Sequence, residues 1–133
     1  MVFEISPPLT NDQLNALFDS AWEHHRPRDF QPILRHSLLY IGAFQGQQLV
    51  GFVNVAWDGG IHAFVLDTTV HQQYQRRGIG QRLMQTAIDA ARTRHIEWLH
   101  VDYEPQLTLF YAKCGFQDTA AGLLNLLDGN RST

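Results

Sequence analysis

The sequence predicts one α/β domain built on a mixed sheet with helices on both faces. Its 133 residues suffice for one hydrophobic core and are too few for two domains. Segments with strand-like and helix-like apolar spacing follow in the order strand, two helices, three strands, helix, strand, helix, strand. Short turns between the three strands predict antiparallel pairing. The strand–helix–strand unit after them predicts a parallel pair with a right-handed crossover.

The first third of the chain is predicted to hold a short strand and two helices. Thr10 and Gln13 form a capping-box pattern, and the apolar residues after them recur at helical spacing. Asp29 is predicted to cap the second helix. The predicted ranges are 2–5 for the strand, a first helix that ends within 24–27, and 30–36 for the second helix.

The middle of the chain changes to strand patterns. The predicted strands span 37–44, 49–57 and 61–70, with turns at 45–48 and 58–60. A helix is predicted over 79–94, because Ile79, Leu83, Ala87 and Ala91 form an apolar stripe on one helical face.

The last third is predicted to hold a strand over 96–103, a helix over 105–113 and a final strand near 123–127. Pro105 suits the first turn of a helix, and Gly115 is typical of the position just after a helix ends. Residues from Asp128 onward are expected to be loose.

Composition narrows the class of protein. The chain is 44% hydrophobic and 17% charged, with a net charge of −3, as is ordinary for a globular protein. The charge does not favour a nucleic-acid partner, because the arginine pair Arg76-Arg77 is local rather than part of a basic stripe. No apolar run approaches the ~20 residues that a membrane span requires, so we expect no membrane partner.

The cysteine content and the N-terminus indicate a compartment. A single cysteine, Cys114, excludes an intramolecular disulfide and a cysteine-built zinc site, and we expect no metal. Residues 1–8 lack the basic region and apolar core of a signal peptide. The cytoplasm is therefore the expected location.

The segment between the strand 61–70 and the helix 79–94 is the strongest functional signal. It reads Val70-His71-Gln72-Gln73-Tyr74-Gln75-Arg76-Arg77-Gly78-Ile79-Gly80-Gln81. Glycine permits a sharp turn and close approach of a ligand, and free N–H groups at a helix start carry positive partial charge. The segment therefore predicts a phosphate or pyrophosphate site. The alternative is a tight turn with solvated arginines.

Two other phosphate-binding motifs do not fit this segment. A Walker loop requires Lys followed by Ser or Thr after its second glycine, whereas Gln81-Arg82 follows Gly80. A dinucleotide fingerprint requires a third glycine, whereas position 83 is Leu.

The segment Gln75-Arg76-Arg77-Gly78-Ile79-Gly80 resembles the Q/R-x-x-G-x-G/A signature of the GNAT superfamily of N-acetyltransferases. Phe110-Tyr111-Ala112-Lys113-Cys114-Gly115-Phe116 resembles the Tyr-x-x-x-Gly-Phe ending of that family. The resemblance implies a GNAT fold: a mixed, mostly antiparallel twisted sheet of six to seven strands, with about four helices on both faces, splayed at the two central parallel strands. The expected domain spans residues 1–133.

The resemblance also implies acetyl-coenzyme A (acetyl-CoA) as the donor. The pantetheine arm is expected to pair with the backbone of Thr68, Thr69 and Val70, as in strand addition. The diphosphate is expected on the turn formed by Gln75, Arg76, Arg77, Gly78, Ile79, Gly80 and Gln81. A homodimer is compatible with the resemblance, and the sequence does not fix it.

The implied reaction is direct attack of a primary amine on the thioester in a ternary complex. Tyr111 matches the family's tyrosine and is the candidate general acid for the leaving thiolate; the alternative is an aromatic residue on a buried helix face. A backbone N–H near Thr69 or Val70 is expected to stabilise the oxyanion. Cys114 has no neighbouring histidine in the sequence and is interpreted as packing.

The general base is not evident. Related enzymes carry Glu or His four to six residues before the strand-ending valine, where this chain has Phe64, Val65 and Leu66. Asp67 is the nearest carboxylate: it either holds the substrate amine or is a hydrogen-bonded strand residue. The weaker candidates, each also readable as surface or packing, are His62, Asp102, Tyr103 and Glu104.

The acceptor site is expected between the first two helices and the strand hairpins. Trp22, Phe30, Trp57 and Tyr103 are candidates to line an apolar cleft, and core packing is the alternative for each. With Asp67 they suggest a small amine that carries an apolar part. A peptide or protein acceptor, or an acyl-CoA-binding module without turnover, are the competing hypotheses.

Overall fold

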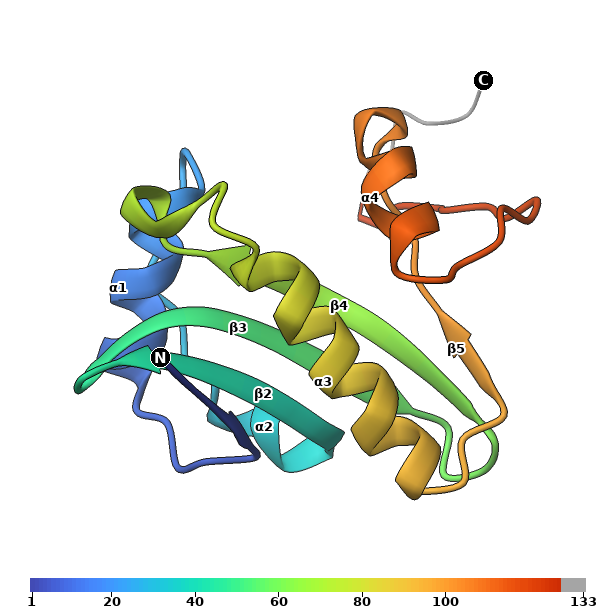
Figure 1. Cartoon of the computed structure of the whole chain (residues 1–133), viewed down its shortest axis with the longest axis horizontal. Coiled ribbons are helices and arrows are strands. Elements are labelled where there is room, and N and C mark those ends of the chain that lie inside the picture. The colour runs from blue at the N-terminus through green and yellow to red at the C-terminus, as the bar shows by residue number, and fades with distance from the viewer. Residues whose placement is uncertain (128–133) are drawn as a thin grey trace. The chain divides into compact units, whose positions relative to one another are not determined.

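The computed structural model describes residues 1–127, which form two compact units, Met1–Val101 and the segment from Asp102 onward. The elements of the first unit are β1 (Val2–Ile5), α1 (Asn11–Ala21), α2 (Gln31–His36), β2 (Ser37–Gln45), β3 (Gln48–Trp57), β4 (His62–Val70), the 3₁₀ helix η1 (Gln72–Tyr74), α3 (Ile79–Thr93) and β5 (Trp98–His100). The second unit holds the 3₁₀ helix η2 (Pro105–Leu107) and α4 (Thr108–Lys113) (Figure 1).

The strands of the first unit form one sheet in the order β1-β2-β3-β4-β5. The pairs β1–β2, β2–β3 and β3–β4 are antiparallel, and β4–β5 is parallel. This confirms a mixed, mostly antiparallel sheet with its parallel pair around α3. The sheet has five strands within residues 1–127, rather than the six to seven expected.

Helices cover both faces of the sheet, as predicted. Successive residues of a strand point to opposite faces. Phe52 of β3 packs in a cluster with Leu14, Leu17 and other residues on or beside α1. A side chain at the neighbouring Gly51 would instead meet the Leu83 side chain of α3 at 3.0 Å. In Figure 1, α3 accordingly lies across one face of β2, β3 and β4, while α2 lies behind β2.

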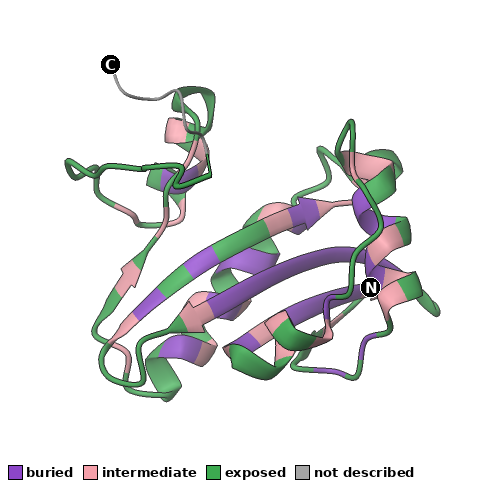
Figure 2. Ribbon diagram, turned by 180° about the vertical axis from the view of Figure 1, so that it is seen from behind, coloured by how far each residue is buried: buried purple, intermediate pink, exposed green. Residues whose placement is uncertain are grey.

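β3 is the centre of the core. Its residues from Leu49 to Val55 are all buried, because helices cover this strand on both faces and β2 and β4 flank it (Figure 2). Together the fully buried side chains exclude water from the middle of the sheet, which is the main source of its stability.

The predicted capping box of α1 is confirmed. The Thr10 hydroxyl accepts from the Gln13 N–H at 3.1 Å, and the Gln13 side chain accepts from the Thr10 N–H at 2.8 Å. The predicted end at 24–27 was wrong: α1 ends at Ala21, and Trp22 is already extended. The side chain of Trp22 is hydrogen-bonded to Thr69 on β4, so the chain leaves the helix axis at this residue.

α2 is capped in a different way from that predicted. Its N-cap residue is Phe30, which makes no side-chain cap. The Asp29 carboxylate nevertheless accepts a hydrogen bond from the Gln31 N–H at 3.0 Å. Asp29, the residue before the N-cap, therefore satisfies one of the free N–H groups at the start of the helix.

The part of the chain after α3 differs most from expectation. α4 ends as predicted, and Gly115 follows with φ of +104°. The strand predicted over 96–103 is reduced to Trp98–His100. The strand predicted near 123–127 was wrong, because these residues are coil and turn with their four leucines exposed. No described strand pairs with this segment, so its apolar pattern alone does not form a ladder. The tail from Asp128 lies outside the described residues.

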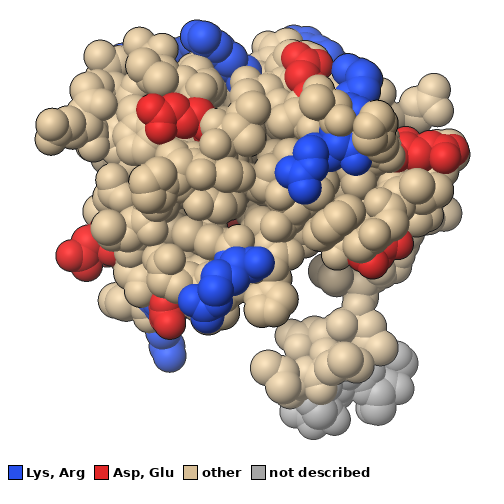
Figure 3. Space-filling view, turned by 90° about the horizontal axis from the view of Figure 1, so that it is seen from below, with Lys and Arg blue, Asp and Glu red and all other residues tan. Residues whose placement is uncertain are grey.

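The surface shows no basic stripe on the face in Figure 3, where Lys and Arg occur in small groups among Asp and Glu. Within residues 1–127, no helix combines the length and the apolar character needed to cross a bilayer.

Phe52 and Phe64 test where the core lies. Phe52 is fully buried, whereas Phe64 on the adjacent strand is 39% exposed. We expect Phe52→Ala to lower the free energy of unfolding by about 3–5 kcal/mol, and Phe64→Ala to lower it by no more than about 1 kcal/mol. Urea denaturation followed by circular dichroism measures both, and equal losses would contradict this assignment of the core.

Candidate active site

The loop between β4 and α3 is tied to the strand before it. The Gln75 side-chain amide donates to the Val70 carbonyl at 3.0 Å, and the His71 N–H donates to the Val50 carbonyl of β3 at 2.8 Å. Arg76 and Gly78 have positive φ values of 65° and 80°. The backbone is therefore left-handed at two positions just before α3 begins.

The start of α3 presents free backbone donors. Its N-cap, Gly78, makes no side-chain cap, and the first hydrogen bond of the helix runs from the Arg82 N–H to the Gly78 carbonyl. Within residues 1–127, the N–H groups of Ile79, Gly80 and Gln81 have no acceptor. They lie at the positive end of a helix of 15 residues. This arrangement suits a bound diphosphate.

β4 contains a β-bulge at Asp67 and Thr68. β3 pairs Phe52 with Thr69 and Asn54 with Leu66, so two residues of β4 stand opposite a single residue of β3. Asp67 accommodates the extra residue with a φ of 59°, in the left-handed region. The bulge therefore lies just before the loop between β4 and α3.

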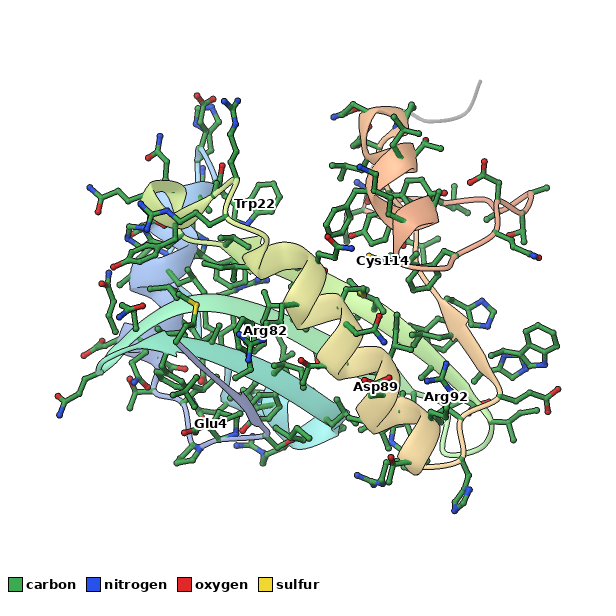
Figure 4. All side chains as sticks on the ribbon, in the orientation of Figure 1. Glu4, Trp22, Arg82, Asp89, Arg92 and Cys114 are labelled. Carbon is green, nitrogen blue, oxygen red and sulfur yellow. The ribbon has the colours of Figure 1, made fainter. Side chains whose placement is uncertain are left out.

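A hydrogen-bonded chain holds the bulge. The indole N–H of Trp22 donates to the Thr69 hydroxyl at 3.0 Å, and that hydroxyl donates to the Asp67 carbonyl at 2.9 Å. Thr69 is only 2% exposed, so both bonds are needed to compensate the burial of its oxygen. Figure 4 shows Trp22 on the turn after α1. The two hydrogen bonds therefore link this turn to β4.

One edge of β4 is unpaired over most of its length. The ladder to β5 runs only from His62 to Phe64. From Val65 to Val70, the described part of the chain provides a ladder partner for β4 on the β3 side alone. This edge can accept an extended ligand that carries amide groups.

An open hollow of about 350 Å³ lies beside the bulge. It is lined by Phe18, Trp22, His24, His25, Arg26, Arg28 and Asp67. Trp22 and Asp67 were predicted from the sequence to contact the acceptor, and both lie on its wall. Phe30 is fully buried beneath it, under the guanidinium of Arg28, and Trp57 is not on its wall.

The basic lining was missed from the sequence. The Arg28 guanidinium lies 3.9 Å from the Asp67 carboxylate, although the two residues are far apart along the chain. A ring nitrogen of His25 lies 2.9 Å from the side-chain oxygen of Asn15 on α1. The only sequence signal was the cluster of histidine and arginine over 24–28. Its relation to Asp67 depends on how the loop packs.

The predicted residues Tyr103 and Tyr111 lie in the second unit, as does Cys114. Tyr111 is buried and stacks on Tyr103, with ring centroids 4.6 Å apart. The Tyr103 hydroxyl donates a short hydrogen bond to the Asp118 carboxylate, and this bond raises the pKa of the Tyr103 phenol. Burial raises the pKa of the Cys114 thiol, which agrees with a packing role rather than a nucleophilic one.

The sequence comparison identifies the family. Residues 8–116, most of the chain, match the family described as "Acetyltransferase (GNAT) family". The chain belongs to this GNAT family.

Relatives of known name agree with that assignment. The chain is 31% identical over 109 residues to "Uncharacterized N-acetyltransferase ycf52" of Porphyra purpurea, a match that covers 78% of this chain and 63% of the relative. The GNAT chain thus spans less than two thirds of that relative's length.

Solved GNAT-like structures share the fold. A putative acetyltransferase from Deinococcus radiodurans R1 superposes with a TM-score of 0.80 at 22% identity, covering 96% of this chain and 89% of the other. AAC(6′)-Iy, solved in complex with the bisubstrate analogue CoA-S-monomethyl-acetylneamine, superposes with a TM-score of 0.72 at 16% identity, covering 94% and 97%.

The hydroxyl of Thr69 tests the support of the bulge. We expect Thr69→Val to lower the free energy of unfolding by about 1–3 kcal/mol, because it leaves the Asp67 carbonyl and the Trp22 indole without their partner. Thr68→Val is the matched control, since no hydrogen bond of the Thr68 side chain occurs within residues 1–127. Urea denaturation measures both variants, and equal stability would contradict the proposed support.

Proposed function

We propose that this GNAT protein is an acetyl-CoA-dependent N-acetyltransferase that acts on a primary amine of a small molecule. The observation that carries the proposal is the group of free amides from Ile79 to Gln81, next to the open edge of the bulged strand β4. Family membership supports acetyl-CoA as the donor, and the CoA analogue bound to the similarly folded AAC(6′)-Iy supports the same donor class.

In this proposal the donor binds along β4 and the loop after it. The diphosphate accepts hydrogen bonds from the amides between Gln75 and Gln81, and Arg76 and Arg77 add positive charge. The pantetheine arm pairs with the backbone of Thr68, Thr69 and Val70, where the edge of β4 is open. The bulge directs that edge away from the regular ladder.

The reaction is direct attack of the amine on the thioester in a ternary complex. The amine must be neutral to attack, although a free alkylamine has a pKa near ~10.4. Asp67 either holds the incoming ammonium or accepts its proton through water. A backbone N–H near Thr69 or Val70 stabilises the tetrahedral oxyanion, and Tyr111 protonates the departing thiolate.

A non-catalytic acyl-CoA-binding module is the second candidate. It is favoured by Phe64, Val65 and Leu66, which stand where related enzymes carry a base and are unable to accept a proton. A peptide acetyltransferase with the same donor site is a variant of the first candidate. The cytoplasm is the compartment that we propose, since the single cysteine suits reducing conditions.

Release of free thiol from acetyl-CoA distinguishes these candidates. The full chain is incubated with acetyl-CoA and a panel of amines, amino acids and peptides, and calorimetry measures donor binding separately. Thiol release that depends on a small amine supports the proposal. Donor binding without release on any acceptor would support the non-catalytic module.

Gly78 tests the diphosphate site. We expect Gly78→Val to weaken acetyl-CoA binding by about 100-fold or more, because the side chain would occupy the space in front of the free amides. Gly46→Val in the β2–β3 turn is the matched control: both glycines have positive φ, and an added Cβ meets nothing within 4 Å at either site. Calorimetry measures the affinity of both variants for acetyl-CoA. Equal affinities would indicate that the diphosphate binds elsewhere.

Tyr111 tests the general acid. We expect Tyr111→Phe to lower kcat by about 10²–10⁴-fold with nearly unchanged donor affinity, because only proton transfer is lost. Tyr40→Phe is the control for loss of a tyrosine hydroxyl, since that hydroxyl bonds the Pro7 carbonyl away from the loop and the hollow. An unaltered kcat in Tyr111→Phe would remove this residue as the acid.

A further inference from the structure

We infer that the acceptor amine also carries an anionic group, a carboxylate or a phosphate, which Arg28 and Arg26 bind in the hollow beside Asp67. This inference rests on the proposed function and names the substrate class of the same site. It replaces the small amine with an apolar part that the sequence suggested, because the hollow is basic.

The wall of this hollow has a local excess of positive charge. The chain has a net charge of −3, and only three Lys or Arg residues precede Gln75: Arg26, Arg28 and Arg35. Two of these three line the hollow, together with His24 and His25. Asp67 is the single acidic residue on its wall, so the wall has an excess of positive charge that favours an anion.

Arg28 is held in place by its backbone. Asn15 of α1 accepts from the Arg28 N–H at 3.0 Å and donates to the Arg28 carbonyl at 2.9 Å. The same Asn15 oxygen lies 2.9 Å from the His25 ring nitrogen. One residue of a regular helix thus fixes two cationic or ionisable residues of the loop, which lowers the entropic cost of binding a ligand there.

The guanidinium of Arg28 is also positioned. Its central carbon lies 4.6 Å from the ring centroid of Phe30 and 5.4 Å from that of Phe18. Stacking on aromatic faces leaves the N–H groups at the rim of the guanidinium free to bind oxygen atoms. The rings below it belong to the core, so this support is rigid.

Arg28 retains donors for a ligand. Within residues 1–127, its guanidinium has only Asp67 as a charged partner, and at 3.9 Å that contact is too long for a hydrogen bond. Both side chains are accessible, at 44% and 35% exposure. Arginine has five N–H donors in a planar fork that matches a carboxylate or a phosphate. A loose, exposed ion pair of this kind contributes little to stability, so stability alone does not explain this arrangement.

Arg28 and Asp67 together match a molecule with two opposite charges. The carboxylate of Asp67 suits the ammonium, and the guanidinium suits an anion a few bonds away. Asp67 is also the bulged residue of β4, the strand along which the donor is proposed to bind. An anion on Arg28 would therefore hold the amine beside the donor strand.

Matched pairs of acceptors test the inference. In each pair, one member carries the anion and the other has a neutral group in its place: alanine and alaninamide, phosphoethanolamine and ethanolamine, glucosamine 6-phosphate and glucosamine. We expect kcat/KM to favour the anionic member of at least one pair by about 10-fold or more. The carboxylate and phosphate pairs show which anion is used. Equal or higher kcat/KM for the neutral members of all pairs would overturn the inference.

Variants connect the preference to the arginines. We expect Arg28→Gln to lower kcat/KM for the anionic member by about 10-fold more than for the neutral member, so that most of the preference is lost. Arg26→Gln, at an exposed loop position, is the second variant if Arg28→Gln fails to fold, and it should reduce the preference in the same direction. Arg35→Gln is the matched control outside the hollow and should retain it. Equal losses for both members of a pair would overturn the inference.

Binding separates this inference from the proposed function. Calorimetry with the CoA-saturated chain measures the affinity of each acceptor without turnover. Arg28-dependent binding of an anionic amine without thiol release would support the inference and reject the enzyme. Thiol release from neutral amines alone, with no binding of anionic ones, would support the enzyme and reject the inference.

Discussion

The bulge in β4 is the constraint on which the rest of the site depends. A β-strand alternates its side chains between two faces, so one extra residue reverses the alternation for everything after it. Before the bulge, Val65 pairs with Val55 of β3, whereas after it Thr69 pairs with Phe52, whose side chain lies on the opposite face of the sheet. Without the bulge, the side chains of β4 from Thr69 onward would point to the opposite face of the sheet.

The bulge is stabilised by two hydrogen bonds that join Trp22, Thr69 and Asp67. Thr69 would be costly to bury alone, and Asp67 would be strained in a left-handed conformation without support. The bond from Trp22 supports both, and it begins on the turn that ends α1. The strand that is proposed to carry the donor and the turn that borders the hollow are thus coupled through a single hydroxyl.

α1 organises the loop after it in the same way. Asn11 accepts from the Phe30 N–H, and Asn15 binds both backbone groups of Arg28. The two asparagines are four residues apart, so they project from the same side of the helix. The two proposed anion sites differ in their donors: free backbone amides at the start of α3 for the diphosphate, and arginine side chains on the loop after α1 for a smaller anion.

The sequence by itself determined the order of the elements, the mixed sheet and the capping box of α1, and it predicted the loop that is proposed to bind a diphosphate. These features depend on the spacing of apolar residues and on glycine and capping residues a few positions apart. Such local patterns can be recognised in the sequence without knowledge of the tertiary structure. Only the tertiary structure decided the bulge at Asp67, the burial of Phe30, the basic character of the hollow and the missing strand near 123–127. Each of these depends on contacts between residues distant in the chain, or on whether a partner strand is available. The spacing of apolar residues along the sequence gives no information about either.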